Sequence, residues 1–171
     1  MYERRGVERE IASPAQALAV RGADIAAGLV NSVTLGCGQF CTKPGLVFVV
    51  DDVASQAFIA RVAELMAQQQ PGVLLNQAVL AHLSADVERT RASGSVSEWP
   101  APEADIPAGY CFPNTVFQTT ADQFIHDESL QNEHFGPVTM FVTCPTPDAL
   151  FEAVESLHGT LTATVHSEAE E

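Results

Sequence analysis

The sequence predicts an α/β fold in which a parallel or mixed sheet is flanked by helices. Short β-branched runs, such as "LVFVV" at 46–50, alternate along the chain with longer segments whose apolar residues recur at helical spacing. Apolar residues make up 46% of the chain, which indicates a packed core. A length of 171 residues is that of one domain large enough to bury such a core.

The first half of the chain is expected to contain three helices and one strand. Glycines at 36–38 end the first helix, Asp52 supplies an oxygen that can cap the next helix, and "PG" at 71–72 separates that helix from the third. In order, we expect a helix at 15–35, a strand at 45–52, a helix ending at Gln70, and a helix that carries Val79, Leu80, Leu83 and Val87 on one side.

The second half is expected to begin with a loop at 92–108, because this stretch contains three prolines. We expect Trp99 to fold back from this loop onto the body of the protein. Thr146 followed by Pro147 is a typical helix start, and Gly159 a typical stop. Strands are predicted at 110–119, interrupted by Pro113, at 137–144, and at 161–167 ("LTATVHS").

The chain is strongly acidic, with 22 acidic and 8 basic side chains and a formal net charge of -14. Such a surface repels phosphate backbones and anionic lipid surfaces, so neither nucleic acid nor a membrane is expected as a partner. No stretch approaches the roughly 18 apolar residues of a spanning helix, and "GVEREIASPAQAL" is too charged for a signal peptide. We therefore expect a cytoplasmic protein.

Metal and nucleotide motifs are not expected in this chain. The sequence has no G-x-G-x-x-G and no Walker loop, so it shows no self-contained phosphate cradle. There is no C-x-x-C, and the five histidines are scattered without ligand spacing, so no metal site is predicted. The cysteines are Cys37, Cys41, Cys111 and Cys144, and we expect the first, third and last to be packed small residues.

Cys41 lies in a glycine-rich turn, "GCGQFCTKPG" at 36–45. A nucleophilic cysteine needs exposure, a nearby base or a stabilised thiolate, and donors for the oxyanion that it creates. Gly36 and Gly38 allow a sharp turn that would expose the thiol and present backbone N–H groups. Lys43 would favour a thiolate, although side chains two residues apart rarely meet. The residues alone leave open that Cys41 is only a small residue at a helix-to-strand corner.

Two motifs resemble the aldehyde dehydrogenase superfamily. "GQFCTKPG" is similar to the family pattern Gly-Gln-x-Cys-Thr, and "NEHFGPV" at 132–138 is similar to Glu-x-Phe-Gly-Pro. The resemblance implies that Cys41 is the catalytic nucleophile. It also implies that Glu133 holds the ribose hydroxyls of the cofactor and that Phe135 packs near the nicotinamide. The similarity extends over about residues 15–168, and it is greatest to the ketoglutarate-semialdehyde and NADP-dependent fatty-aldehyde branch.

The resemblance implies a fold and a reaction. The fold would be part of an aldehyde dehydrogenase catalytic domain. Cys41 would form a thiohemiacetal with a small-molecule aldehyde, such as 2,5-dioxopentanoate or a fatty aldehyde. Hydride transfer to NADP or NAD would leave a thioester, and water would release the carboxylic acid. Full-length relatives are expected to be homo-oligomers.

The chain also departs from the family pattern. We expect residues 1–14 to be an atypical, loose N-terminus and residues 15–171 to be a cysteine-bearing catalytic domain that is truncated at both ends. The family's cofactor domain and its Glu-x-Gly-Gly or Glu-x-Gly-Ser base segment are not seen, and the base is not assigned to Glu3, Glu8 or Glu10. The isolated chain is therefore expected to be inactive in aldehyde oxidation. Two alternatives stay open: a cofactor-independent thiol esterase that uses Cys41, and a non-enzymatic remnant or interaction module.

Overall fold

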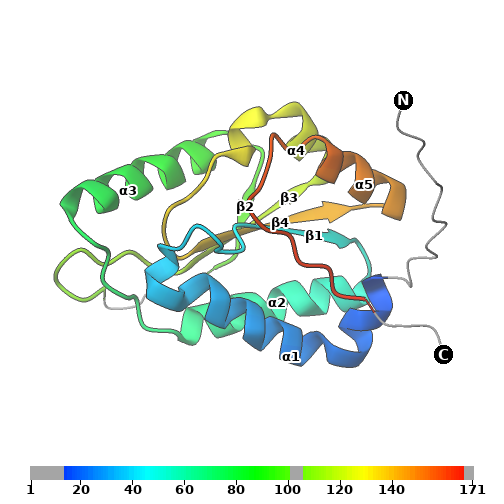
Figure 1. Ribbon diagram of the computed structural model, residues 1–171, viewed down its shortest axis with the longest axis horizontal. Coiled ribbons are helices and arrows are strands. Elements are labelled where there is room, and N and C mark those ends of the chain that lie inside the picture. Colours follow the sequence, from blue (N-terminus) through cyan, green and yellow to red (C-terminus); the bar gives the residue numbers. More distant parts are fainter. Residues whose placement is uncertain (1–13, 101–105, 168–171) are drawn as a thin grey trace.

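The computed structural model describes residues 14–100 and 106–167, and it confirms the α/β class predicted from the sequence. The N-terminal segment that we expected to be loose lies outside the described residues as far as position 13, so that prediction stays untested. The elements, drawn in Figure 1, are α1 (Pro14–Thr34), η1 (Leu35–Gly38), β1 (Leu46–Val50), α2 (Val53–Gln68), α3 (Gln77–Ala92), β2 (Ser97–Glu98), β3 (Thr115–Thr120), α4 (Ala121–His126), η2 (Glu128–Gln131), β4 (Val138–Cys144) and α5 (Pro147–Glu155).

The four strands form one mixed sheet in the order β1-β4-β3-β2. Strand β4 pairs in parallel with both β1 and β3, whereas β2 pairs antiparallel with β3. Figure 1 shows α1 and α2 on one side of the sheet and α3, α4 and α5 on the other. Because helices cover both faces, every residue of the central strand β4 is buried.

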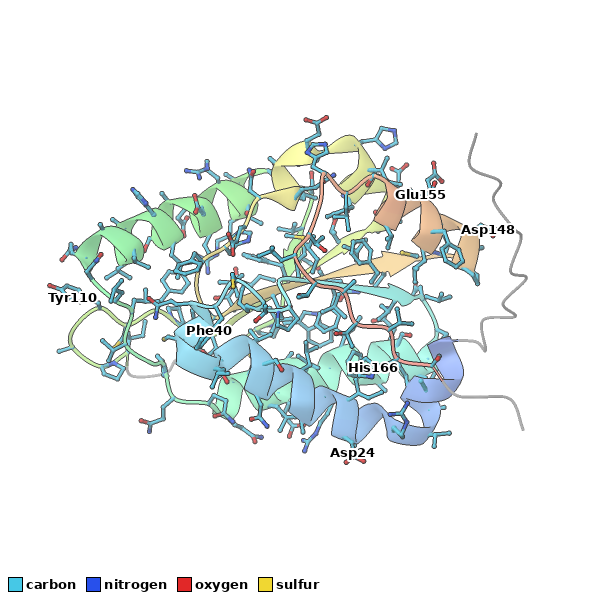
Figure 2. All side chains as sticks on the ribbon, viewed as in Figure 1. Asp24, Phe40, Tyr110, Asp148, Glu155 and His166 are labelled. Atoms are coloured by element: carbon cyan, nitrogen blue, oxygen red, sulfur yellow. The ribbon has the colours of Figure 1, made fainter. Side chains whose placement is uncertain are left out.

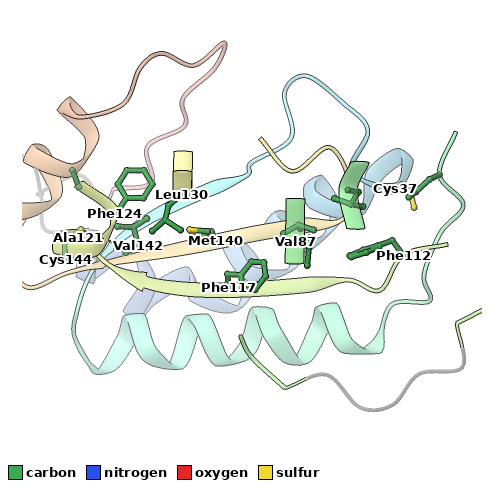
Figure 3. Close-up of a cluster of buried hydrophobic side chains, with 14 residues drawn as sticks. Cys37, Val87, Phe112, Phe117, Ala121, Phe124, Leu130, Met140, Val142 and Cys144 are labelled. Atoms are coloured by element: carbon green, nitrogen blue, oxygen red, sulfur yellow. Dashed lines mark hydrogen bonds between the residues drawn. The ribbon is translucent and has the colours of Figure 1, made fainter. Parts of the chain in front are cut away.

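The alternation of side chains along β4 divides the core into two clusters. Met140 and Val142 face α3, α4 and α5, in the cluster that Figure 3 shows, whereas Phe141 faces α1 and α2. The ring of Phe141 meets that of Phe58 edge to face, with centroids 5.9 Å apart. Burial of one such side chain contributes roughly 2 kcal/mol to stability. The two clusters therefore hold three layers together around β4.

Helix caps predicted from the sequence are confirmed. Asp52 accepts a hydrogen bond from the N–H of Ser55 at 2.7 Å and begins α2. Thr146 accepts from the N–H of Ala149 at 3.2 Å and begins α5, with Pro147 at the first helical position. Both caps place the following helix immediately after a strand, so they fix how each helix folds back onto the sheet.

The predicted strand at 161–167 is wrong, because this stretch is not part of the sheet and all of its residues are exposed. Its alternating pattern would have buried Leu161 and Val165 on one face, yet they are 77% and 80% exposed. A strand is stabilised by a hydrogen-bonded neighbouring strand and by a buried face, and within the described part of the chain this stretch has neither. The preceding helix also ends earlier than Gly159, at Glu155.

The expected loop at 92–108 contains a short strand, so this prediction is correct only in part. Strand β2 is held at β3 by the N–H of Trp99, which donates to the carbonyl of Val116 at 2.9 Å. The guanidinium of Arg91 also binds both carboxylate oxygens of Glu98, at 2.6 and 2.8 Å. Trp99 does fold back onto the body, where it packs against the cluster of α1 and α2. By contrast, the predicted strand at 110–119 begins only at Thr115, after Pro113.

The stretch Ala17–Gly38, which includes most of α1, is long and apolar enough to cross a membrane by length and composition alone. This finding corrects our expectation that no stretch approaches that length. In the fold, α1 packs against α2 and buries Ile25, Val30 and Val33. Only 22% of this apolar stretch is buried in the fold, so α1 lies at the surface and buries one face.

Candidate active site

The turn before Cys41 has an unusual backbone. Gly36, Cys37 and Gly38 have φ values of 56°, 62° and 69°, so three successive residues are left-handed. Glycine adopts this conformation without strain, whereas Cys37 is the one non-glycine residue with a positive φ in the described part of the chain. The side chain of Cys37 is buried beside Gly72. A Cβ atom added to Gly72 would lie only 2.7 Å from the Cys37 sulfur, so there is no room for a side chain at position 72. This packing holds the strained residue in place.

Gly38 joins the turn to the second motif. A Cβ atom at Gly38 would lie 2.7 Å from the nitrogen of Pro137, and closer still to the carbonyl group of Gly136. The backbone of the turn therefore lies directly on the backbone of the 133–138 segment. The two motifs, which are far apart in the sequence, are thus neighbours in the structure.

Cys41 is exposed, whereas the other three cysteines are buried, and all four are free thiols. Burial raises the pKa of the Cys37 thiol, and it raises the pKa of Cys144 to about 11. As predicted, these buried cysteines are packed small residues, and Cys37 and Cys144 belong to the cluster in Figure 3. Of the four thiols, only that of Cys41 is open to a substrate or reagent.

Lys43 fastens the turn to the second motif in a way that the sequence reasoning missed. Its side chain does not lie free beside Cys41. Its ammonium group donates hydrogen bonds to the carbonyls of His134, at 2.9 Å, and Val138, at 2.7 Å. Burial lowers the pKa of Lys43 to about 8, although the nearby carboxylate of Glu133 opposes this shift. Lys43 is the only lysine in the sequence, and this is the one signal that could have drawn attention to it.

The second motif presents its side chains to opposite sides. Glu133 and Phe135 are exposed, the latter by 40%, whereas His134 between them is only 8% exposed. The Nε2 atom of His134 lies 2.9 Å from the hydroxyl of Thr90, and burial, with Lys43 next in importance, lowers its pKa to about 4. His134 is therefore a neutral, interior residue. The two residues expected to bind the cofactor are the ones that face outward.

Gln39 holds the turn through its side-chain amide. Its side-chain nitrogen donates to the carbonyl of Gly36 at 2.9 Å, and its side-chain oxygen accepts from the N–H of Leu75 at 2.8 Å. The segment at 72–75 in turn lies beside the one at 110–111, because the N–H of Leu74 donates to the carbonyl of Tyr110 at 2.8 Å. Figure 2 shows Phe40 and Tyr110 near the same end of the molecule. The Cys41 turn is thus surrounded by segments that fix its shape.

An open pocket of about 450 Å³ lies between α3 and η2, and His134 is one of its lining residues. Its lining includes Asp86, Arg89 and Asp127 but not Cys41, Glu133 or Phe135. The pocket therefore adjoins the second motif through Asn132 and His134, but it does not reach Cys41 or the exposed side chains of Glu133 and Phe135. Within residues 14–100 and 106–167, no three His, Cys, Asp or Glu side chains are grouped closely enough to hold a metal ion.

Comparison of the chain with known proteins identifies its family. The sequence profile "Aldehyde dehydrogenase family" matches residues 10–171. The chain is 35% identical over 164 residues to alpha-ketoglutaric semialdehyde dehydrogenase 2 of Azospirillum brasilense; this alignment covers 91% of the chain and 29% of that protein. It is 31% identical over 156 residues to alpha-ketoglutaric semialdehyde dehydrogenase of Acinetobacter baylyi, covering 88% of the chain and 28% of that protein.

A solved structure shows the same fold. The structure of methylmalonate-semialdehyde dehydrogenase from Oceanimonas doudoroffii superposes with a TM-score of 0.68 at 15% identity, over 80% of this chain and 30% of that one. The chain therefore spans less than a third of the length of these relatives. Since the family profile matches nearly the whole chain, this protein belongs to the aldehyde dehydrogenase family.

Proposed function

We propose that this chain supplies the nucleophile and part of the cofactor site of an NAD(P)-dependent aldehyde dehydrogenase. Cys41 is the nucleophile, and Glu133 and Phe135 contact the cofactor. The observation that carries the proposal is the packing of Gly38 on Gly136, since it places an exposed thiol and an exposed Glu–Phe pair on adjoining segments. Aldehyde oxidation needs a nucleophile and a hydride acceptor at one place.

The reaction begins at the Cys41 thiolate, whose sulfur forms a bond to the aldehyde carbon while the carbonyl electron pair moves to oxygen. The backbone N–H of Cys41 donates to the resulting oxyanion of the thiohemiacetal. When bound, NAD(P)+ supplies the acceptor for the hydride that leaves this carbon, so Cys41 then carries a thioester. Water breaks the C–S bond, releases the carboxylic acid and restores the thiol.

Residues 133–135 fit a nicotinamide nucleotide. The carboxylate of Glu133 is exposed and can accept hydrogen bonds from two ribose hydroxyls. The ring of Phe135 offers an apolar face beside it. Buried His134 anchors the segment between them through Thr90.

The substrate is a small-molecule aldehyde. We propose 2,5-dioxopentanoate, the ketoglutarate semialdehyde, because both curated relatives are named for it, and we retain a fatty aldehyde as the second choice. A cytoplasmic location and homo-oligomers of the full-length relatives stay predictions from the sequence and from the family resemblance. Because the chain spans 29% of the first relative, we expect the 171 residues alone to oxidise aldehydes poorly.

The test is acylation of Cys41 by p-nitrophenyl acetate, an activated ester, in the 171-residue chain. We expect an acyl group on Cys41, found by peptide mass spectrometry, and a rate above that of glutathione under the same conditions. The Cys41→Ser variant should lose this acylation. Added NADP+ or NAD+ should change the rate in the wild type but not in Glu133→Gln, because the variant loses a charged acceptor for the ribose hydroxyls.

Other outcomes distinguish the alternatives. Continued release of nitrophenol after Cys41 is acylated would favour the thiol esterase, because the thioester would then be turning over without a cofactor. A Cys41 rate no higher than that of glutathione, together with no effect of either NADP+ or NAD+, would favour the non-enzymatic remnant and would overturn the proposal.

A further inference from the structure

We propose that Lys43 is a positioning residue that holds the Cys41 turn in register with the cofactor segment at 133–138. This inference rests on the proposed roles of Cys41, Glu133 and Phe135. It adds a residue that neither the family motifs nor the sequence reasoning assigned.

The first argument is the placement of the two hydrogen bonds. Lys43 follows Cys41 by two residues, and its acceptors, the carbonyls of His134 and Val138, lie on either side of Gly136 and Pro137. Gly38 packs on that same Gly136–Pro137 unit. The turn is therefore attached to the segment at two points, one on each side of Cys41, by backbone packing and by an ammonium group.

The second argument is the environment of the charge. Within the described residues, Lys43 forms no ion pair of 4.0 Å or less, although Glu133 is close enough to influence it. A half-buried ammonium without a paired carboxylate costs stability, and here two backbone carbonyls offset that cost. An apolar side chain of the same length would fill this space without that cost. A lysine at position 43 is explained if its N–H donors are needed to hold the backbone of residues 133–138 in place.

The third argument is the precision that the chemistry requires. A misplacement of about 1 Å between a nucleophile and its reaction partner can reduce a rate about a hundredfold. Glu133 and Phe135 flank His134, whose carbonyl is one of the two acceptors of Lys43. A shift of this carbonyl relative to Lys43 would therefore move the cofactor residues relative to Cys41.

The experiment compares the wild type with Lys43→Met, which keeps the length of the side chain but removes its donors, and with Lys43→Arg, which keeps donors. A nitroxide attached to Cys41 broadens the NMR signals of nearby amides and so reports the placement of residues 133–136 directly. We expect Lys43→Met to weaken this broadening and to make it uneven, and Lys43→Arg to restore most of it. Equal broadening in the wild type and in Lys43→Met would overturn the proposal.

Amide hydrogen exchange gives the second readout. We expect the amides of Gly136 and Val138 to exchange about tenfold faster in Lys43→Met, since a lost hydrogen bond to a charged group costs on the order of 1.5 kcal/mol. The amides of Ile59 and Val62, on the buried face of α2, should keep their protection. Equal acceleration everywhere would show a general loss of stability and would contradict a positioning role.

The unsubstituted chain provides a measurement in case Lys43→Met does not fold. Because Lys43 is the only lysine, its ammonium gives a single side-chain NMR signal. We expect this signal to exchange slowly with water and to titrate well below the ordinary lysine pKa of about 10.4, whereas rapid exchange and an ordinary titration would overturn the proposal. Hydrogen exchange and the Lys43 signal do not involve the thiol, and spin labelling needs only an accessible thiol and no reaction with an aldehyde or ester. Failure of the proposed chemistry and failure of the positioning role are therefore seen separately.

Discussion

Gly38 lies where the structure has no room for a side chain, and replacing it tests the contact between the two motifs. The nearest atoms to a Cβ at this position belong to the backbone of Gly136 and Pro137. Backbone atoms cannot rotate away as the end of a flexible side chain can. The Gly38→Ala substitution must therefore either shift the 133–138 segment or displace the Cys41 turn.

The expected loss of stability has two parts. A residue with a Cβ pays about 1–2 kcal/mol for a left-handed backbone, and Gly38 has a φ of 69°. Overpacking a closely packed site costs a further 1–3 kcal/mol or so. We therefore expect Gly38→Ala to lower the free energy of unfolding by about 2–5 kcal/mol, a large part of the roughly 5–15 kcal/mol of a typical domain.

Other glycines in the chain provide matched controls for the two parts. Gly94 has a φ of 72° but no atom within 4 Å of its Cβ position, so Gly94→Ala should cost only the backbone part, about 1–2 kcal/mol. Gly22 and Gly28 lie in α1 with open space around them, and changing either to Ala should stabilise the protein by up to about 1 kcal/mol. The assay is urea unfolding of each purified variant. If Gly38→Ala destabilises no more than Gly94→Ala, the close contact between the two motifs is wrong.

Two further predictions concern pH and helix capping. The pKa of His134 is about 4 in the folded protein and about 6.5 when unfolded, so the unfolded state takes up the proton first as the pH falls; stability should decrease by up to about 3 kcal/mol between pH 6.5 and 4. Urea unfolding at several pH values checks this, and an equal pH slope in His134→Asn would contradict it. Asp52→Ala should cost about 1 kcal/mol through loss of the α2 cap, whereas Asp51→Ala, at an exposed position, should cost less; equal losses in urea unfolding would argue against the cap.

Local signals in the sequence predicted much of the fold. The helical spacing at 15–35, the β-branched run at 46–50, and the caps Asp52 and Thr146 each depend on residues close together in the chain. Such elements form because nearby side chains and backbone groups satisfy one another. The glycines at 36–38 likewise predicted a sharp turn, and all of this stretch is left-handed in the structure.

The features that sequence reasoning missed depend on distant parts of the chain. The alternation in "LTATVHS" is that of a strand, yet in the structure this stretch remains outside the sheet. From the sequence, Lys43 was considered only for its effect on the thiol of Cys41. In the structure its hydrogen bonds reach the 133–138 segment, more than ninety residues away in the chain. The adjacency of the Cys41 turn and the 133–138 segment was implied by the family resemblance alone, and composition and periodicity gave no sign of it.

The most direct test of the account is the rate of iodoacetamide labelling at each of the four cysteines, measured by mass spectrometry in the folded chain and again in urea. Each thiol then serves as its own control for intrinsic reactivity. Because Cys37, Cys111 and Cys144 are buried, they should label more slowly in the folded chain than in the unfolded one. If the turn prepares Cys41 for nucleophilic attack, Cys41 should label faster when folded than when unfolded. A folded rate at Cys41 equal to or below its unfolded rate would contradict the account, because the turn would then only expose the thiol without activating it.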